Sequence, residues 1–326
     1  MAVLQESTSA DRADKDRSVS TRQASEMLGV HESSVKRWCN ANELEFWLTP
    51  GGHRRIPIHA LVRFANTQRI DLHLRHFGAD AGEVWALLDQ IKQKTDFNGL
   101  VALCYRWIQQ SEIARMTYLM THLVNTGYSV GMVFDYLVGP VMSRVGVNYF
   151  EGNLTIGDEH RMTQVMRDIL VTLSTTSALK LKEKPETPPV AIVGCARGEV
   201  HELGALMVRV LLEAMGWKIV YLGLNVPTEE FAHQQLKHGA ALVCISLMPP
   251  MGIPEAHAMI RLLDRIYDKT LPYRLILGGS ALGNNTEPAA LITRIPDVKL
   301  FSRMAPFQDW LGNVPPVLTY SNGSSN

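Results

Sequence analysis

Hydrophobic residues change their spacing along the chain. Between residues 80 and 181 they recur every three or four positions, which predicts helices. After residue 188, short apolar runs alternate with amphipathic segments such as 205–215 and 229–238. The runs that we expect to be strands are 190–193, 218–222, 241–245, 274–277 and 298–301. Buried strands alternating with helices predict a parallel sheet covered on both faces, and five strands fit a flavodoxin-like, Rossmann-type sheet.

The segment 18–75 has the pattern of a DNA-binding head. We expect a helix over Thr21–Leu28 with Thr21 as its N-cap, a turn at Gly29, and a second helix from Ser33. In a helix-turn-helix, the second helix enters the major groove of DNA. Residues 49–56, TPGGHRRI, then predict a glycine hairpin that presents basic side chains as a wing. The residues that we expect to contact DNA are Ser33, Ser34, Lys36, Arg37, His53, Arg54 and Arg55.

Charge supports this interpretation only locally. The whole chain has 32 basic and 32 acidic residues, which argues against a uniformly basic surface. Segment 18–75 has eight lysines and arginines against five acids, a net charge of +3. Such a head makes few phosphate contacts, so we expect binding to double-stranded operator DNA to need a homo-oligomer, a dimer or a tetramer. The alternative is a small helical domain with a solvated basic face. Residues 18–66 resemble the MerR and excisionase-like winged helix-turn-helix families, most specifically in GGHRR.

The remaining composition excludes other classes of protein. The four cysteines lie far apart without a CxxC pair, which argues against a zinc cluster or a disulfide framework. The longest uncharged apolar stretch, 239–254, holds three prolines and is too short to cross a bilayer. The polar lead-in 1–17, which we expect to be disordered, has no apolar signal core. We therefore expect a cytoplasmic protein without a membrane partner, with a linker at 180–189 and a flexible tail at 314–326.

A histidine follows the first predicted strand in a glycine-rich loop, GCARGEVHELG, over residues 194–204. The glycine spacing does not fit a phosphate cradle. Glu199 instead precedes His201 by two residues, and a metal-bound histidine commonly donates its other ring N–H to a carboxylate. We expect Gly204 to let the following helix pack close to a large flat ligand. The alternative is a loop histidine that faces solvent.

The motif Glu199-x-His201-x-x-Gly204 resembles the cobalamin-binding signature, Asp or Glu-x-His-x-x-Gly. Two further parts of that signature follow in order, Ser246-Leu-Met248 after the third predicted strand and Gly278-Gly279 after the fourth. The resemblance implies that His201 is the lower ligand of cobalt and that Glu199 is its hydrogen-bond partner. It also implies that Ser246, Gly278 and Gly279 line the slot for the displaced nucleotide tail.

The order of head, helical segment and sheet resembles the CarH/LitR class of light-responsive MerR-type repressors. In that class a four-helix cap covers the upper face of the corrin, and its motif is Trp, nine residues, then Glu-His. Here Glu159-His160 is present, and Tyr149 stands at the tryptophan position. The resemblance implies that these three residues contact adenosylcobalamin or methylcobalamin. Phe150 takes the place of the histidine that captures cobalt after photolysis, and a phenyl ring cannot bind metal.

These observations predict a multidomain α and α/β protein with a winged helix-turn-helix head, a four-helix cap and a five-stranded sheet. We interpret it as a transcriptional repressor whose oligomerisation and operator binding follow bound cobalamin, in response to light. It is not interpreted as an enzyme, because no nucleophile–base pair is evident. The alternatives are a corrinoid methyl carrier, which needs no basic head, and a regulator of this fold without cobalamin or with another chromophore. We expect Glu199→Gln to lower cobalamin affinity less than His201→Ala, because it only retunes the ring nitrogen.

Overall fold

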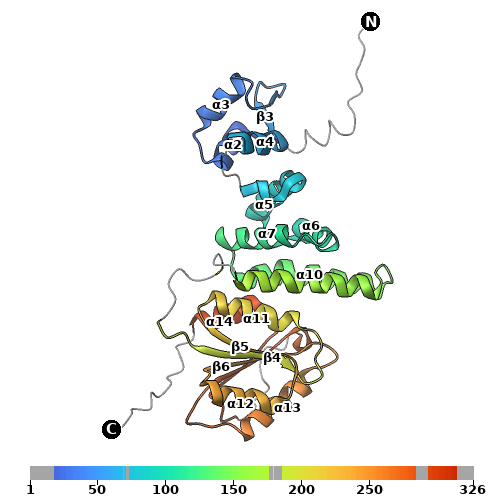
Figure 1. The fold of residues 1–326 in the computed structure, drawn as a ribbon, viewed down its shortest axis with the longest axis vertical. Coiled ribbons are helices and arrows are strands. Elements are labelled where there is room, and N and C mark those ends of the chain that lie inside the picture. Colours follow the sequence, from blue (N-terminus) through green and yellow to red (C-terminus); the bar gives the residue numbers. More distant parts are fainter. Residues whose placement is uncertain are drawn as a thin grey trace. The chain divides into compact units, whose positions relative to one another are not determined.

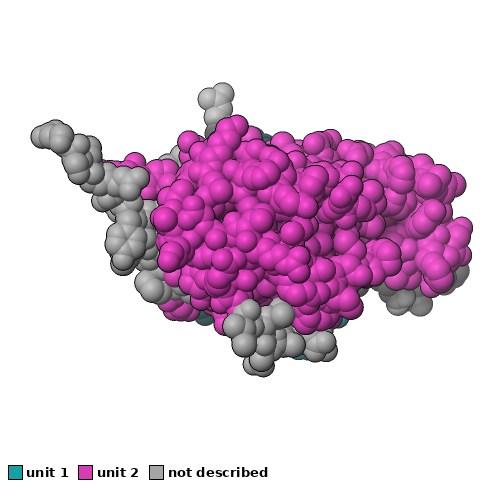
Figure 2. All heavy atoms as spheres, turned by 90° about the horizontal axis from the view of Figure 1, so that it is seen from below, with its two compact units in different colours: residues 1–102 teal, residues 103–326 magenta. Residues whose placement is uncertain are grey.

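The computed structural model describes residues 18–68, 70, 73–175, 179, 186–283 and 293–313. The chain forms two compact units, residues 1–102 and 103–326, which Figure 2 colours separately. The boundary falls inside helix α6 (Asn98–Gln109). The expected lead-in 1–17, the expected tail 314–326 and residues 180–185 of the expected linker lie outside the described residues.

The head in the first unit contains the predicted helix-turn-helix. Helices α2 (Thr21–Leu28) and α3 (Glu32–Asn40) are separated by Gly29, whose φ of 65° lies in the left-handed region that glycine adopts freely. Strands β2 (Trp47–Leu48) and β3 (Arg54–Pro57) pair antiparallel and form the predicted hairpin. Helices α4 (Ile58–Gln68) and α5 (Ala81–Lys94) follow, with the short helix η1 (His73–Asp80) between them.

The start of the head differs from the prediction. A strand that we did not expect, β1 (Ser18–Ser20), pairs with β3. Ser20, not Thr21, caps α2, because Ser20 Oγ accepts the Gln23 N–H at 3.2 Å and Gln23 Oε1 accepts the Ser20 N–H at 2.9 Å. This reciprocal pair is a capping box. Thr21 Oγ1 donates instead to Glu32 Oε1 at 2.7 Å, which joins the two helices.

A layer of helices fills the middle of the chain and belongs to the second unit from residue 103 onward. It comprises the end of α6 and then α7 (Ile113–Asn125), α8 (Val130–Val133), the π-helix η2 (Phe134–Val138), α9 (Gly139–Phe150) and α10 (Ile156–Thr175). The run Val130–Phe150 is long and apolar enough to cross a membrane by length and composition alone. A core helix passes the same test, and Val133, Phe134 and Leu137 of this run are buried in the protein.

The carboxyl-terminal half confirms the five predicted strands. They are β4 (Val190–Ala196), β5 (Lys218–Val226), β6 (Leu242–Ser246), β7 (Arg274–Gly278) and β8 (Asp297–Phe301), in the spatial order β5-β4-β6-β7-β8. All neighbouring pairs are parallel, which gives the flavodoxin-like order. Figure 1 shows α11 (Leu203–Ala214) and α14 (Met304–Asn313) on one face and α12 (Thr228–His238) and α13 (Ile253–Arg265) on the other.

The helical layer is seated on the face that carries α11 and α14. Helix α10 packs against α11, and α8 packs against α14. A Cβ on Gly131 would lie 2.7 Å from Ala305 Cα, so only glycine allows this close approach. The Asp135 carboxylate also accepts the N–H groups of Met304 and Ala305 at 2.8 and 2.9 Å and thereby caps α14. The helical layer and the sheet therefore form one unit.

Candidate functional site

The residues of the cofactor signature gather at the carboxyl edge of the sheet. The strand register places Cys195, Ser246, Gly278 and Phe301 opposite one another across four neighbouring strands. The loop that carries His201 leaves β4 at this edge and leads into α11. Parallel sheets bind ligands at this edge. The predicted residues from three separate motifs therefore meet at the edge where a ligand site is expected.

The carboxylate of Glu199 holds the loop together by hydrogen bonds. Glu199 is almost fully buried, with 2% of its surface exposed. Its Oε1 accepts the N–H of Val200 at 2.9 Å and of His201 at 2.8 Å, and it lies 2.6 Å from His201 Nδ1. Its Oε2 accepts the N–H of Met248 at 2.6 Å. One carboxylate thus orients the imidazole and ties the histidine loop to the loop after β6.

The His201 ring is positioned as a ligand would be. With Nδ1 engaged by Glu199, Nε2 is the nitrogen left for a metal, and the side chain is 58% exposed. Cys195 Sγ donates to the His201 carbonyl at 3.7 Å. Burial, reinforced by the charges of Glu199 and Glu202, raises the pKa of the Cys195 thiol to about 12, so this sulfur stays protonated at neutral pH. The described residues hold no group of three or more potential metal ligands.

The glycines of the signature lie beside this loop, and at each of them a neighbouring backbone or hydroxyl group comes very close to the place that a Cβ would take. A Cβ on Gly279, whose φ is 134°, would lie 1.9 Å from the Leu247 carbonyl oxygen, and one on Gly278 would lie 3.2 Å from Phe301 O. A Cβ on Gly204 would lie 2.8 Å from Ser246 Oγ. The nearest protein neighbour of Gly204 is therefore the Ser246 hydroxyl, and the expected approach of a flat ligand to Gly204 stays a prediction.

Ser246 supports the fit of a cofactor tail here. Its side chain is buried at 6% exposure, and its Oγ has no hydrogen-bond partner among the described residues. A buried hydroxyl without a partner costs free energy, and a polar atom of a bound ligand removes that cost. Together with the outward Nε2 of His201, this orphaned hydroxyl fits a group that brings both a metal and a polar tail.

Apolar side chains stand exposed near the loop and on the cap. Val200 is 72% exposed and Leu224 is 43% exposed at the carboxyl edge. At the tip of α9, Tyr149 is 44% and Phe150 is 91% exposed. Single exposed apolar side chains are ordinary on a protein surface, so these four do not mark a site by themselves.

Helix α10 carries the Glu159-His160 pair of the cap. The Glu159 carboxylate holds His160 Nδ1 at 2.5 Å and accepts the Thr163 hydroxyl at 2.8 Å. Two turns further along α10, roughly 11 Å at 1.5 Å per residue, Arg167 Nε donates to Glu202 Oε2 at 2.8 Å. Glu202 follows His201 in the chain, so α10 connects the Glu159-His160 pair to the loop that carries His201.

The head presents most of the residues predicted to contact DNA. Ser33, Lys36 and Arg37 of α3 are exposed, as is His53 in the hairpin, while Ser34 is half-buried. His31 caps α3, since its Nδ1 accepts the Ser33 N–H at 3.3 Å. Lys36 pairs with Glu32 at 2.9 Å on the exposed surface, and such a pair is weak enough for DNA to replace.

Arg54 is half-buried and bonded within the head, a contact that the GGHRR pattern did not predict. Its Nη2 donates to Asn40 Oδ1 at 2.8 Å, and its guanidinium lies 5.4 Å from the centre of the Phe46 ring. Asn40 is the last residue of α3, so Arg54 fastens the wing to the recognition helix. Arg55 points to the other face of β3, because side chains alternate along a strand.

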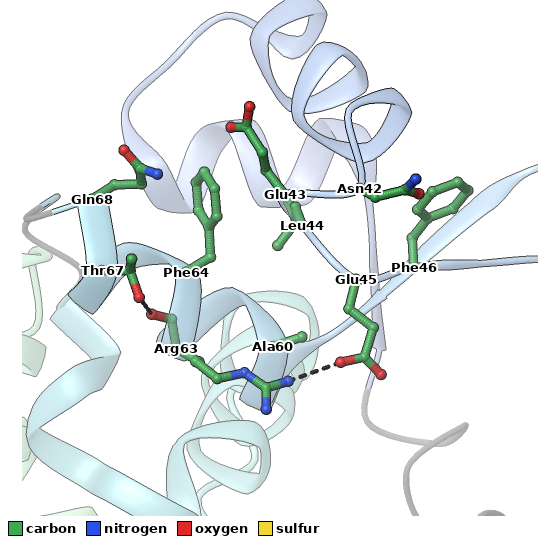
Figure 3. Close-up of a pocket in the computed structure, with 10 residues that line it drawn as sticks. All are labelled: Asn42, Glu43, Leu44, Glu45, Phe46, Ala60, Arg63, Phe64, Thr67 and Gln68. Carbon is green, nitrogen blue, oxygen red and sulfur yellow. Dashed lines mark hydrogen bonds and ion pairs between the residues drawn. The ribbon is translucent and has the colours of Figure 1, made fainter.

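A cavity of about 630 Å³ also lies in the head, between α4 and the segment before β2 (Figure 3). Arg63 donates to Glu45 across its mouth at 2.8 Å, and Glu43 also lines it. Carboxylates repel phosphate, and none of the predicted DNA-contacting or cofactor residues lines this cavity. It is separate from both candidate sites.

Comparison with protein families agrees with the two sites. Residues 189–287 match the B12 binding domain, and residues 18–69 match a helix-turn-helix domain. Two segments of the chain are thus similar to known domains, one a helix-turn-helix domain and the other a B12 binding domain. The two matches cover the segments that contain the His201 loop and the GGHRR wing.

Individual relatives are distant. The HTH-type transcriptional repressor CarH of Myxococcus xanthus is 26% identical over 148 residues, which are 45% of this chain and 47% of CarH. A corrinoid protein of Desulfitobacterium hafniense is 23% identical over 137 residues, 41% of this chain and 62% of the relative. The chain thus spans less than two thirds of either relative. The structure of the Methanosarcina barkeri monomethylamine corrinoid protein covers 64% of this chain and 94% of its own, with a TM-score of 0.48 and 17% identity.

Proposed function

We propose that this chain is a DNA-binding transcriptional repressor whose assembly and operator binding depend on a cobalamin held by His201. The observation that carries the proposal is the bond between His201 Nδ1 and the buried Glu199, in a chain that also has a helix-turn-helix domain. A carboxylate that accepts the ring N–H fixes the tautomer and raises the basicity of the other nitrogen. A corrinoid carrier does not need a DNA-binding head, so the helix-turn-helix domain favours a regulator over a carrier.

Each predicted residue takes a role in this proposal. Bound adenosylcobalamin or methylcobalamin supplies a cobalt ion that accepts one imidazole ligand from the protein. His201 Nε2 provides that ligand, and Ser246, Gly278 and Gly279 line the tail slot beside Gly204. Tyr149, Glu159 and His160 of the cap would contact the bound cofactor. An aromatic ring at residue 149 suits a flat apolar surface.

Light acts weakly in this proposal. Phe150 stands at the exposed tip of α9 and offers no metal-binding atom. Illumination of the adenosylcobalamin-loaded chain therefore changes its assembly less than in CarH/LitR members with a histidine there. Visible spectra and size measurements on dark and illuminated protein test this: a stable bis-histidine spectrum in the illuminated state contradicts it.

We assign DNA binding to residues 18–75, the cap to 80–181 and the cofactor domain to 188–313, in a cytoplasmic homo-oligomer. A head with a net charge of +3 needs a second head on a spaced half-site for specific binding. Dimers or tetramers provide it.

The first experiment tests the cofactor. Hydroxocobalamin is titrated into the full chain, and binding is followed by calorimetry and by the visible spectrum. His201→Ala is expected to lower affinity sharply, because alanine leaves the ligand position empty. His238→Ala, at the exposed end of α12, is the matched control and leaves affinity unchanged. Equal affinity of wild type and His201→Ala overturns the assignment of His201.

The second experiment separates the regulator from its alternatives. Fluorescence anisotropy measures binding to a labelled DNA duplex, with and without hydroxocobalamin, for the full chain and for a chain that starts at Ala79. The proposal requires that the full chain binds DNA, that cobalamin changes this binding, and that the truncated chain does not bind. Cobalamin binding without DNA binding indicates a corrinoid carrier. DNA binding that cobalamin leaves unchanged indicates a regulator that works without this cofactor.

A further inference from the structure

Glu202, the residue after His201, is engaged by two parts of the fold. Its Oε2 accepts Arg167 Nε of α10 at 2.8 Å, and its Oε1 accepts the Tyr221 hydroxyl of β5 at 3.2 Å. Its side chain is 20% exposed. Its carbonyl accepts the Leu206 N–H at 3.0 Å in the first turn of α11. Glu202 is therefore fixed by the cap, by the sheet and by the helix that it starts.

The contact is one end of a polar strip between α10 and α11. At the other end, Ser174 of α10 donates to Glu213 of α11. Arg209 joins the two ends, because its Nε lies 3.0 Å from Glu213 Oε1 and its guanidinium lies 5.6 Å from the centre of the Tyr221 ring. Positions seven residues apart on α10, such as 167 and 174, share a face. The strip thus follows the packed face of the cap helix.

The loop between β4 and α11 is consequently held at both sides of His201. Glu199 anchors it to the Met248 N–H, and Glu202 anchors it to Arg167 of the cap. Any movement of the His201 ring on binding metal is transmitted to Glu199 or Glu202, because only Val200 and His201 lie between these two anchors.

We propose that Glu202 is a positioning residue for His201. We also propose that its pair with Arg167 couples occupation of the cofactor site to the packing of α10 against α11. The inference rests on the proposed cobalamin site and adds the path by which that site reaches the cap. Coupling between two sites is reciprocal. Packing of α10 against α11 favours the orientation of His201 that binds the cofactor, and the bound cofactor in turn favours that packing.

Arg167→Met removes the charge and keeps an apolar stem, and Glu202→Gln removes the acceptor charge at constant shape. Arg161→Met is the matched control, because Arg161 of α10 donates to Gln109 O and Ser111 Oγ within the cap and not to the sheet domain. Thermal unfolding first shows which variants fold. If Arg167→Met does not fold, Glu202→Gln carries the test.

Two quantities are measured: hydroxocobalamin affinity, and hydrogen exchange of the α10 amides with and without hydroxocobalamin. In wild type and in Arg161→Met, the cofactor slows exchange in α10. In Arg167→Met and Glu202→Gln that slowing disappears, and affinity falls about tenfold, which is within the usual range of coupling between sites. The double variant behaves like either single variant, because both remove the same interaction.

An equal slowing of α10 exchange in wild type and Arg167→Met overturns the coupling, and additive losses of affinity in the double variant overturn the pair as its path. The protein without cofactor separates this inference from the proposed function. Glu202→Gln is expected to speed exchange of the amides after His201 even there, whereas unchanged exchange contradicts the positioning role. Failure of wild type to bind hydroxocobalamin overturns the proposed function and, with it, the coupling.

Discussion

Replacing Glu199 by glutamine changes the site more than the sequence indicates. The carboxylate accepts N–H groups on both oxygens: those of Val200 and His201, with the ring Nδ1, on Oε1, and that of Met248 on Oε2. Glutamine has one oxygen. Its NH₂ group either faces the Met248 N–H or, after a flip, faces the donors on the Oε1 side. A donor then meets a donor in a buried place, whichever way the amide turns.

The cost follows from the number of bonds affected. A hydrogen bond to a charged group contributes about 1.5–3 kcal/mol, and a buried donor left without an acceptor costs about 1–3 kcal/mol. Losing the Met248 bond and leaving its N–H against another donor therefore lowers the free energy of unfolding by about 2.5–6 kcal/mol. Native proteins are stable by only about 5–15 kcal/mol. The milder effect expected from the sequence concerned cobalamin affinity and stays a prediction, whereas this cost concerns the free energy of unfolding.

Urea unfolding of the protein without cofactor measures this cost. His201→Ala removes an exposed ring and leaves the backbone N–H bonds to Glu199 in place, so it is expected to cost only about 1–2 kcal/mol. The two variants then rank oppositely in two assays: Glu199→Gln loses more stability, and His201→Ala loses more cobalamin affinity. An unfolding midpoint for Glu199→Gln equal to that of wild type would falsify the four-bond arrangement.

Three further predictions concern other parts of the molecule. Arg55→Ala is expected to reduce the slope of log affinity against log salt concentration for DNA binding by about 0.9. Arg54→Ala is expected to weaken binding with an unchanged slope, because the Arg54 guanidinium bonds Asn40. Anisotropy at several salt concentrations distinguishes the two variants, and equal changes of slope refute the difference. Gly204→Ala should destabilise the protein through contact with Ser246 Oγ, and adding Ser246→Ala should restore part of the loss in urea unfolding; purely additive losses contradict this. The raised pKa of Cys195, about 12 against 9.0, stabilises the fold below pH 9, and that stability is lost as pH rises toward 12; Cys195→Ala should therefore lose less stability between about pH 8 and pH 10.5 than wild type.

Local signals in the sequence were sufficient for the elements and for part of the site. The change of period after residue 188 predicted all five strands, because strands buried on both faces must be apolar throughout. The turn at Gly29 and the hairpin at Thr49–Ile56 were predicted because their backbone requirements are met within a few residues. The pair Glu199 and His201 was found in the same way, since its two members are separated by one residue.

The tertiary structure decided the contacts between distant segments. The Met248 N–H reaches Glu199 across 49 residues, and Arg167 reaches Glu202 across 35. Nothing in the local pattern specifies such pairs, because they depend on which elements lie side by side after folding. The same holds for Arg54: its place in GGHRR predicts a phosphate contact, and only the folded hairpin shows that its guanidinium also bonds Asn40. Sequence spacing thus determined which residues could act, and packing determined what each of them touches.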